Sequence, residues 1–184
     1  MWEENQLQDF ERQVVPFLPA AYNLARWLMK DERDAQDAVQ ESYLRAFRFF
    51  GGFHGETPRG WLLKIVRNTC YTWLRQSRSQ QLTEEFDEEF FGADPRVLNP
   101  EENLLQNETG RVVRRALETV PSTLRETLVL RELEGMSYRE ISEVTGSPIG
   151  TVMSRLSRGR DSLRDSLNRL SNRAALRHKS KTAA

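Results

Sequence analysis

The stretch SYREISEVTGSPIGTVMSRLSRGR, residues 137–160, decides the fold of the C-terminal half of the chain. Ser137 followed by Glu140 has the spacing of a capping box, which predicts the start of a helix. Gly146 stands where a helix ends in a left-handed residue. Ser147-Pro148 then predicts an N-cap followed by proline at the first position of a second helix. Two short helices joined by a glycine-containing turn are typical of a helix-turn-helix.

The second helix has one apolar face and one small, polar face. Spacings of three and four predict that its buried residues are Ile149, Val152 and Leu156, as Ile141 and Val144 are in the helix before it. The opposite face carries Thr151, Ser154, Ser157 and Arg158, flanked by Met153 and Arg155. Small residues allow a helix to enter a major groove, and arginine binds guanine or phosphate. An ordinary helical hairpin with a solvated face is the alternative, but it leaves this cluster of arginines unexplained.

Charge is distributed unevenly along a chain of 184 residues whose 27 basic and 27 acidic side chains cancel. Residues 57–83 include five basic residues and no acidic one, whereas residues 84–102 include eight acidic residues and the single Arg96. The chain turns basic again after Gly150. This order predicts two modules, 5–78 and 108–172, joined by a flexible acidic linker over 79–107. The linker is either a spacer or an acidic segment that covers a basic face.

Several classes of protein lack support in the sequence. The single Cys70 excludes an intramolecular disulfide and is expected to be a structural residue, and nothing around His54 or His178 has metal-ligand spacing. The chain contains no apolar run of the ~20 residues that a membrane span needs and no signal-peptide pattern, so we expect a cytoplasmic protein. Because the familiar catalytic and cofactor motifs are also missing, we expect no enzyme, no cofactor and no metal.

The N-terminal module is predicted to be wholly helical, with helices over 10–29, 34–50 and 58–78. In the second helix the inward residues are Ala35, Ala38, Val39, Ala46 and Phe50. Its other face collects Asp37, Gln40, Glu41, Leu44, Arg45 and Arg48. A leucine within a polar face suggests a surface that docks another protein, although a solvated face with one stray apolar residue is also common.

The third helix of this module has the clearest functional pattern. Its buried stripe is predicted to be Leu62, Ile65, Val66, Thr69 and Trp73, and its other face to be Trp61, Lys64, Asn68, Tyr71, Arg75 and Arg78. Cations that follow a phosphate backbone, interleaved with aromatic rings that accept unstacked bases, suit single-stranded nucleic acid. The alternative is that Trp61 and Tyr71 lie in a seam between helices.

The C-terminal module is expected to place two supporting helices before the helix-turn-helix. The first covers 111–120 with its apolar face formed by Val112, Val113, Ala116, Leu117 and Val120, and the second covers 122–134 and ends at Gly135. The last helix is predicted to reach about Leu170. The basic tail over 173–184 is predicted to be disordered.

Three segments together resemble one family. DAQDAVQESYLRAF, PRGWLLKIVRNTCYTWLRQ and LRELEGMSYREISEVTGSPIGTVMSRLSRGRDSL are similar to segments of the extracytoplasmic-function sigma factors of bacterial RNA polymerase, in the same order. The resemblance covers both modules and implies an all-α fold, with a region 2 helical bundle and a region 4 helix-turn-helix.

The resemblance also implies partners and roles. Asp37, Gln40, Glu41 and Leu44 would bind the clamp coiled coil of the largest subunit of core RNA polymerase. The segment around Asn68 and Tyr71 would capture a flipped base of the downstream promoter element, and Met153, Ser154, Ser157 and Arg158 would read the upstream element. Arg155 and Arg160 are expected on phosphates. The family further implies an anti-sigma partner.

The sequence thus predicts a sigma factor that recognises the −35 and −10 elements, promotes melting and forms no homo-oligomer. A helix-turn-helix repressor or activator that binds duplex DNA is the first alternative, and it leaves the aromatic and basic face of 58–78 unexplained. A regulator that sequesters a transcription factor through its helical faces is the second.

Overall fold

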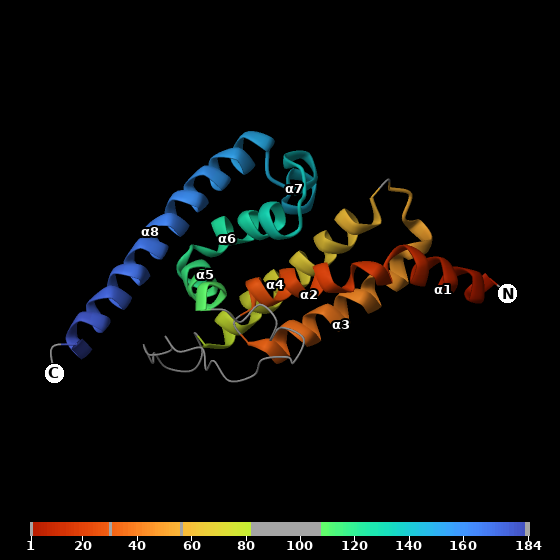
Figure 1. Cartoon of the computed structure of the whole chain (residues 1–184). Helices are drawn as coiled ribbons and strands as arrows, with labels where there is room; N and C mark the ends of the chain where they lie inside the picture. The colour runs from red at the N-terminus through yellow and green to blue at the C-terminus, as the bar shows by residue number, and fades with distance from the viewer. Residues whose placement is uncertain (1, 30, 56, 82–107, 183–184) are drawn as a thin grey trace.

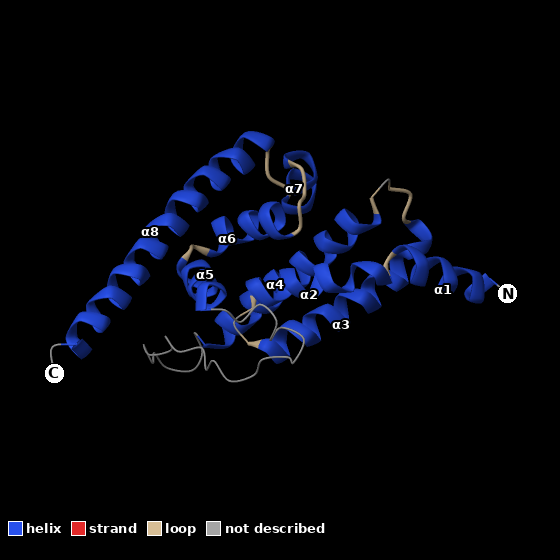
Figure 2. Ribbon diagram, viewed as in Figure 1, coloured by secondary structure: helices blue, strands red, loops and turns tan. Residues whose placement is uncertain are grey.

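The computed structural model describes residues 2–29, 31–55, 57–81 and 108–182. Within these ranges the chain is helical and contains no strand, in agreement with the predicted all-α class (Figures 1 and 2). Most of the expected linker, residues 82–107, lies outside the described residues. Residues 79–81 form the end of a helix.

The N-terminal half begins with two helices where one was predicted. Helix α1 covers Trp2–Gln13, a short 3-10 turn covers Val15–Phe17, and α2 covers Leu18–Leu28. The expectation of one continuous helix over 10–29 was therefore wrong. Its physical reason is the pair Pro16 and Pro19, because a proline lacks the N–H that a helix interior needs and fits the first turn of a new helix.

Helix α3 covers Glu32–Phe49, and its start is set by Asp31. The Asp31 carboxylate accepts hydrogen bonds from the backbone N–H groups of Arg33 and Asp34, at 2.7 and 3.2 Å, so it acts as the N-cap. The inward face is confirmed, since all of its predicted residues are buried: Ala35, Ala38, Val39, Ala46 and Phe50.

Helix α4 covers Pro58–Gln81 and lies at the centre of the molecule (Figure 1). Leu62, Val66 and Thr69 are fully buried as predicted, and Ile65 and Trp73 are half-buried. Leu63 and Cys70 are also buried, although the predicted stripe omits them. Helix α4 packs against α2 and α3 on one side and against the C-terminal half on another, so more than one stripe is covered.

In the C-terminal half, α5 covers Glu108–Thr119 and α6 covers Ser122–Leu128. The helix expected over 122–134 changes after Leu128 into a wider π-helical turn, Val129–Leu133. It ends at Gly135, whose φ of 66° is left-handed and therefore suits glycine. Ala116, Leu117 and Val120 are buried, but Val113, at the edge of its apolar stripe, is 37% exposed.

The helix-turn-helix consists of α7, Tyr138–Thr145, and the first turns of α8, which covers Ile149–Thr182. The capping box is confirmed: Ser137 Oγ accepts from the Glu140 N–H at 3.2 Å, and Glu140 Oε2 accepts from the Ser137 N–H at 2.7 Å. Gly146 ends α7 with a φ of 66°. Val152 and Leu156 are buried as predicted. Ile149, the first residue of α8, was predicted to be buried but is 46% exposed.

Helix α8 runs to Thr182, well beyond the end expected near Leu170 and through most of the predicted disordered tail. The sequence NRAALRHKSK contains no glycine or proline and several strong helix formers. A helix already nucleated upstream adds such residues without a new nucleation step.

The two halves are packed against each other. Helix α4 contacts α7, and α2 contacts α6, so that buried residues from both halves form one continuous apolar cluster. Figure 1 shows α6 and α7 lying over α4 and α2. Helix α8 packs against α5, α6 and α7, on the side of the C-terminal half that faces away from α2, α3 and α4. The packing sets the surroundings of Arg67 and Tyr71 on α4, which meet the C-terminal half.

Candidate nucleic-acid and polymerase interfaces

The first turns of α8 present the face that the sequence predicts for duplex reading. Ser154, Ser157 and Arg158 are exposed and Met153 is 52% exposed, while Thr151 is half-buried. Ser154 Oγ donates to the Thr151 carbonyl at 3.0 Å, and Arg158 Nε donates to the Ser154 carbonyl at 3.3 Å. These local hydrogen bonds hold the polar side chains along the helix on the side opposite Val152 and Leu156.

The position of this helix depends on a close approach at Gly159. A Cβ atom at Gly159 would lie 3.1 Å from Leu128 Cγ and 3.4 Å from the Leu124 carbonyl oxygen. Leu128 is itself buried. Helix α8 therefore crosses α6 at a distance that glycine permits, which fixes the angle at which its exposed face is presented.

Arg155 and Arg160, both expected on DNA phosphates, have protein partners in the structure. Arg155 is half-buried, and its Nη1 donates to Ser147 Oγ at 2.9 Å. Arg160 is exposed and donates to Glu132 Oε1 through Nη2 at 2.7 Å and Nε at 3.1 Å. Arg160 can turn to a phosphate by leaving an exposed pair of small energetic value. Arg155 lies near Tyr71 of the N-terminal half, since its charge acts on the Tyr71 hydroxyl.

On α4, the predicted strand-binding face divides into exposed and covered residues. Lys64, Asn68 and Arg75 are exposed. Trp61 is half-buried, its ring 4.6 Å from that of Phe53 and 6.4 Å from that of Phe50, measured between centroids. Trp61 thus lies in an aromatic cluster, while the side chain of Arg78 lies outside the described residues.

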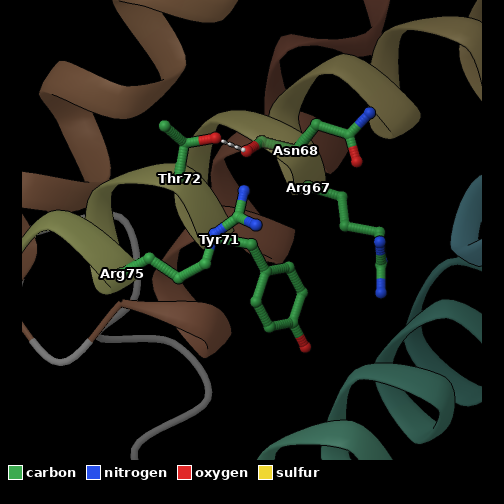
Figure 3. A pocket seen from close by; sticks show the side chains of 5 residues that line it. All are labelled: Arg67, Asn68, Tyr71, Thr72 and Arg75. Atoms are coloured by element: carbon green, nitrogen blue, oxygen red, sulfur yellow. Dashed lines mark hydrogen bonds between the residues drawn. The ribbon is translucent and has the colours of Figure 1, made fainter. Parts of the chain in front are cut away.

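An open pocket of about 370 Å³ lies along the same face of α4. It is lined by Arg67, Asn68, Tyr71, Thr72 and Arg75, which all come from successive turns of one helix (Figure 3). Its lining combines two guanidinium groups, an amide and an aromatic ring and contains no carboxylate. This composition suits a base and its attached phosphates.

Arg67 and Tyr71 extend from α4 toward the C-terminal half (Figure 3). Both donate hydrogen bonds to Glu126 of α6 there. Arg67 Nε donates to Glu126 Oε1 at 2.5 Å and Nη2 approaches Oε2 at 3.5 Å, while the Tyr71 hydroxyl donates to Oε2 at 3.3 Å. The Arg67 guanidinium also lies 4.6 Å from the centroid of the Tyr71 ring. Sequence analysis did not identify Arg67 and Glu126. Glu126 directly precedes the run TLVL, residues 127–130, and glutamate is an unusual residue for a buried position.

Burial governs the electrostatics of this contact. The Glu126 side chain is fully buried, and its burial raises the pKa of the carboxyl group despite the opposing effects of Arg67, Tyr71 and Arg155. Burial, together with the Glu126 charge, also raises the pKa of the Tyr71 hydroxyl to about 12, so this hydroxyl remains a donor at neutral pH.

A second polar contact joins the halves at Glu134. Its carboxylate accepts from Arg59 Nη2 at 2.7 Å and from Asn23 Nδ2 at 2.6 Å, and its carbonyl accepts from Arg59 at 2.6 Å. Nearby, Arg125 Nη1 donates to the Trp27 carbonyl at 3.2 Å. These contacts, with the Glu126 contact, fix the C-terminal half on α2 and α4.

The predicted docking face of α3 is mostly open. Asp37 and Gln40 are exposed, and Leu44 is 65% exposed. Glu41 is half-buried because it accepts from Trp73 Nε1 on α4 at 2.9 Å and is paired with Arg45. Leu44 thus lies exposed beside Asp37, Gln40 and Glu41. Trp73 and Arg45 hold the Glu41 carboxylate in place.

Among the described residues, no group of three histidine, cysteine or acidic side chains is arranged to hold a metal ion. Within the same ranges, no helix is both long enough and apolar enough to cross a membrane.

Comparisons with known proteins agree with this geometry. The sequence matches the family Sigma-70 region 2 over residues 14–80 and the family Sigma-70, region 4 over residues 110–163. The RNA polymerase sigma-H factor of Pseudomonas aeruginosa is 33% identical over 169 residues, which cover 88% of this chain and 87% of that protein. The ECF RNA polymerase sigma-E factor of Escherichia coli K12 is 34% identical over 137 residues, covering 71% of this chain and 72% of that protein.

Solved structures show the same architecture. The sigma factor RpoE of Bartonella quintana, in complex with the anti-sigma factor NepR, matches with a TM-score of 0.68 at 27% identity, covering 88% of this chain and 98% of that chain. CnrH in complex with the cytosolic domain of CnrY matches with a TM-score of 0.63 at 24% identity, over 88% of this chain and 89% of that chain, a likeness that concerns the fold alone. With both regions present in order and relatives matched over most of their length, the chain belongs to the extracytoplasmic-function sigma factors of bacterial RNA polymerase.

Proposed function

We propose that this chain binds core RNA polymerase, recognises the −35 and −10 elements of promoters and promotes their melting. The single observation that carries the proposal is the combination of two different nucleic-acid surfaces on one chain: a small, polar helix face on α8 and a basic and aromatic face on α4. The membership of the family and the names of the relatives support it.

On α8, Thr151, Met153, Ser154, Ser157 and Arg158 are the proposed readers of the −35 duplex, with Arg155 and Arg160 on phosphates. Exposure of Met153, Ser154, Ser157 and Arg158 supports this assignment, as does the close packing of α8 on α6 at Gly159. An α-helix with small side chains enters the major groove without steric conflict.

On α4, the proposed binders of the unpaired −10 strand are Trp61, Lys64, Asn68, Tyr71, Arg75 and Arg78. The open pocket beside Asn68 and Tyr71 supports capture of a base there. Base–aromatic stacking contributes about 1–3 kcal/mol per base, which is comparable with about 1.4 kcal/mol for a base-pair step. A few captured bases therefore offset the opening of a few pairs without any covalent chemistry by the protein, and we assign it no enzymatic activity.

On α3, Asp37, Gln40, Glu41 and Leu44 are the proposed contacts with the clamp coiled coil of the polymerase. The exposure of Leu44 beside exposed Asp37 and Gln40 supports this role. A protein with these partners works in the cytoplasm. A relative of this fold, the Bartonella sigma factor, was solved with an anti-sigma factor, and we propose a partner of that class for this chain as well.

The experiment is in vitro transcription with core polymerase and a promoter that sigma factors of this family recognise. Permanganate footprinting of unpaired thymines measures the melting of this promoter. Lys64→Ala, Asn68→Ala and Arg75→Ala, combined, should reduce thymine reactivity strongly, because they remove two cations and an amide from the strand-binding face. Arg12→Ala is the matched control, since Arg12 is an exposed arginine on α1, away from that face.

Normal melting by the triple variant would contradict the assignment of α4. A duplex-binding repressor or activator would give specific gel shifts without core enzyme and no transcription with it, which is the outcome expected for the alternative function.

A further inference from the structure

We propose that Arg67 and Tyr71 form a binding site for a backbone phosphate of the unpaired promoter strand, and that Glu126 occupies this site while the two halves of the protein are packed together. The inference rests on the proposed function and deepens it. Packing of the halves and binding of the strand at Arg67 then exclude each other.

The first argument is the geometry of the contact. Arg67 directs Nε and Nη2 toward the two oxygens of one carboxylate, at 2.5 and 3.5 Å, and the Tyr71 hydroxyl donates to the second oxygen at 3.3 Å. A guanidinium binds two oxygens of a phosphate in the same planar manner as it binds a carboxylate. The three donors converge on one anion, and Glu126 supplies that anion in this arrangement.

The second argument is that the N-terminal half offers Arg67 no acidic partner along α4. Residues 57–83 contain no aspartate or glutamate, and the neighbours of Arg67 at spacings of three and four are Leu63, Lys64, Cys70 and Tyr71. The negative charge comes from Glu126, 59 residues away in the sequence. Separation of the halves would therefore leave a guanidinium beside an aromatic ring with no carboxylate on the same helix.

The third argument is continuity with the strand-binding face. Arg67 and Tyr71 line the same open pocket as Asn68 and Arg75, and the lining contains no carboxylate. A strand whose base enters this pocket would carry a flanking phosphate past Arg67. Glu126 fills the end of that path with the same charge.

The fourth argument is that Glu126 is a displaceable occupant. Its side chain is fully buried, and burial raises the pKa of its carboxyl group, which means that the charged form is held at a cost. A phosphodiester is ionised at every physiological pH and reaches Arg67 from solvent. Promoter DNA held by the polymerase can therefore replace Glu126 at the Arg67 guanidinium.

The experiment compares the two partners of the pair, because the proposal gives them effects of opposite sign. Arg67→Ala removes the phosphate site as well as the contact between the halves, so the affinity of the holoenzyme for a pre-melted promoter should fall about tenfold or more. Glu126→Ala removes only the occupant, so that affinity should stay unchanged or rise. Asp9→Ala is the matched control, since it breaks an exposed acid–arginine pair on α1, away from the proposed DNA-binding faces.

Salt dependence separates a phosphate contact from a structural one. For Arg67→Ala the slope of log affinity against log salt concentration should decrease in magnitude by about 0.7, the value for one phosphate on a single strand. For Glu126→Ala and Asp9→Ala the slope should equal that of the wild type.

The packing of the free, full-length chain is measured by electron–electron distance between spin labels at Arg48→Cys and Asn168→Cys, both of which are exposed. Cys70 does not compete for label because it is buried, with the pKa of its thiol raised to about 12. Arg67→Ala and Glu126→Ala should both broaden and lengthen the distribution, and Asp9→Ala should not. If Glu126→Ala fails to fold, as judged by circular dichroism, Glu126→Gln replaces it, because it removes the negative charge of the occupant and leaves Arg67 and Tyr71 of the site intact.

Equal losses of affinity in Arg67→Ala and Glu126→Ala, or an unchanged salt slope in Arg67→Ala, would overturn the proposal. These results are distinguishable from failure of the proposed function, which would show as an inability of the wild-type holoenzyme to open and transcribe the promoter.

Discussion

Trp73 of α4 donates its indole N–H to Glu41 Oε2 of α3 over 2.9 Å. The two residues connect the surfaces assigned to different partners, since Glu41 lies on the proposed polymerase-docking face and Trp73 on the helix proposed to bind the promoter strand. Glu41 is also paired with Arg45 on its own helix. Its carboxylate is therefore held in one orientation before any partner arrives.

Trp73→Phe should weaken docking on core polymerase. The substitution keeps an aromatic ring but removes the N–H, so the half-buried Glu41 loses a hydrogen bond worth about 1 kcal/mol and gains rotamer freedom. We expect a similar loss of stability and a several-fold loss of affinity for core enzyme, measured by fluorescence anisotropy with labelled sigma factor. Tyr22→Phe is the control: it deletes a 3.0 Å hydrogen bond to Glu32, away from the docking face, and should leave core affinity unchanged. Equal effects of both variants would argue against a positioning role for Trp73.

Two glycines near the turn of the helix-turn-helix, Gly146 and Gly150, should respond in opposite ways to substitution by alanine. Gly146→Ala should lower the free energy of unfolding by about 1–2 kcal/mol, because a φ of 66° is unfavourable for a residue with a Cβ atom. Gly150→Ala, within α8, should be neutral or stabilise by up to about 1 kcal/mol, since a Cβ there meets no atom within 4 Å. Urea unfolding of both variants makes the comparison. A Gly146→Ala variant as stable as the wild type would contradict the left-handed conformation of this turn.

The local features of the fold were predictable from sequence because each depends on a few neighbouring residues. The capping box at Ser137 and Glu140, the left-handed Gly146 and the inward face of α3 all follow from side-chain chemistry and helical spacing. The break near Pro16 could also have been read from the sequence, but the apolar periodicity on both sides of it favoured one long helix.

The tertiary contacts that cover α4 and α8 were not predictable in the same way. Whether Tyr71 and Trp61 face solvent depends on what packs over α4, and the answer involves Glu126 for one and Phe53 for the other. Arg155 has the spacing of a DNA-facing residue, yet it donates a hydrogen bond to Ser147 and lies near Tyr71 and Glu126, on which its charge acts. Helical periodicity identifies faces, but it does not determine which face of a distant segment will cover them.

Cys70 should be chemically silent in the folded protein. Burial raises the pKa of its thiol to about 12, so the reactive thiolate is scarce at pH 8 and the sulfur is also inaccessible. We expect alkylation by iodoacetamide to be slow in buffer and to become fast in 8 M urea, as followed by mass spectrometry. An exposed control cysteine, Asn168→Cys, should react in both conditions. Rapid modification of Cys70 in the native protein would contradict its burial.

The stability of the packed protein should respond to pH through Glu126. Because burial raises the pKa of Glu126 in the folded state, the folded protein binds this proton more tightly than the unfolded chain does. The contribution of Glu126 to stability is therefore fully present below its unfolded pKa and decreases as pH rises through its folded pKa. Arg67 and Tyr71 from α4 and Arg155 from α8 face the carboxyl group and oppose part of this shift without reversing it.

The measurement is the difference in free energy of unfolding between wild type and Glu126→Gln from pH 5 to pH 8. The wild type should gain on the variant as pH falls, since Gln cannot take up a proton. The other titratable groups, including Glu140 with its lowered pKa, are common to both proteins and largely cancel in the difference. Glu132→Gln, at an exposed pair, should not reproduce this gain. A difference that is constant with pH, or that favours the wild type more at high pH, would mean that the charge of Arg67 outweighs the effect of burial on the pKa of Glu126. The ionised Glu126 carboxylate would then stabilise the packing of the two halves, and a phosphate would not displace it easily.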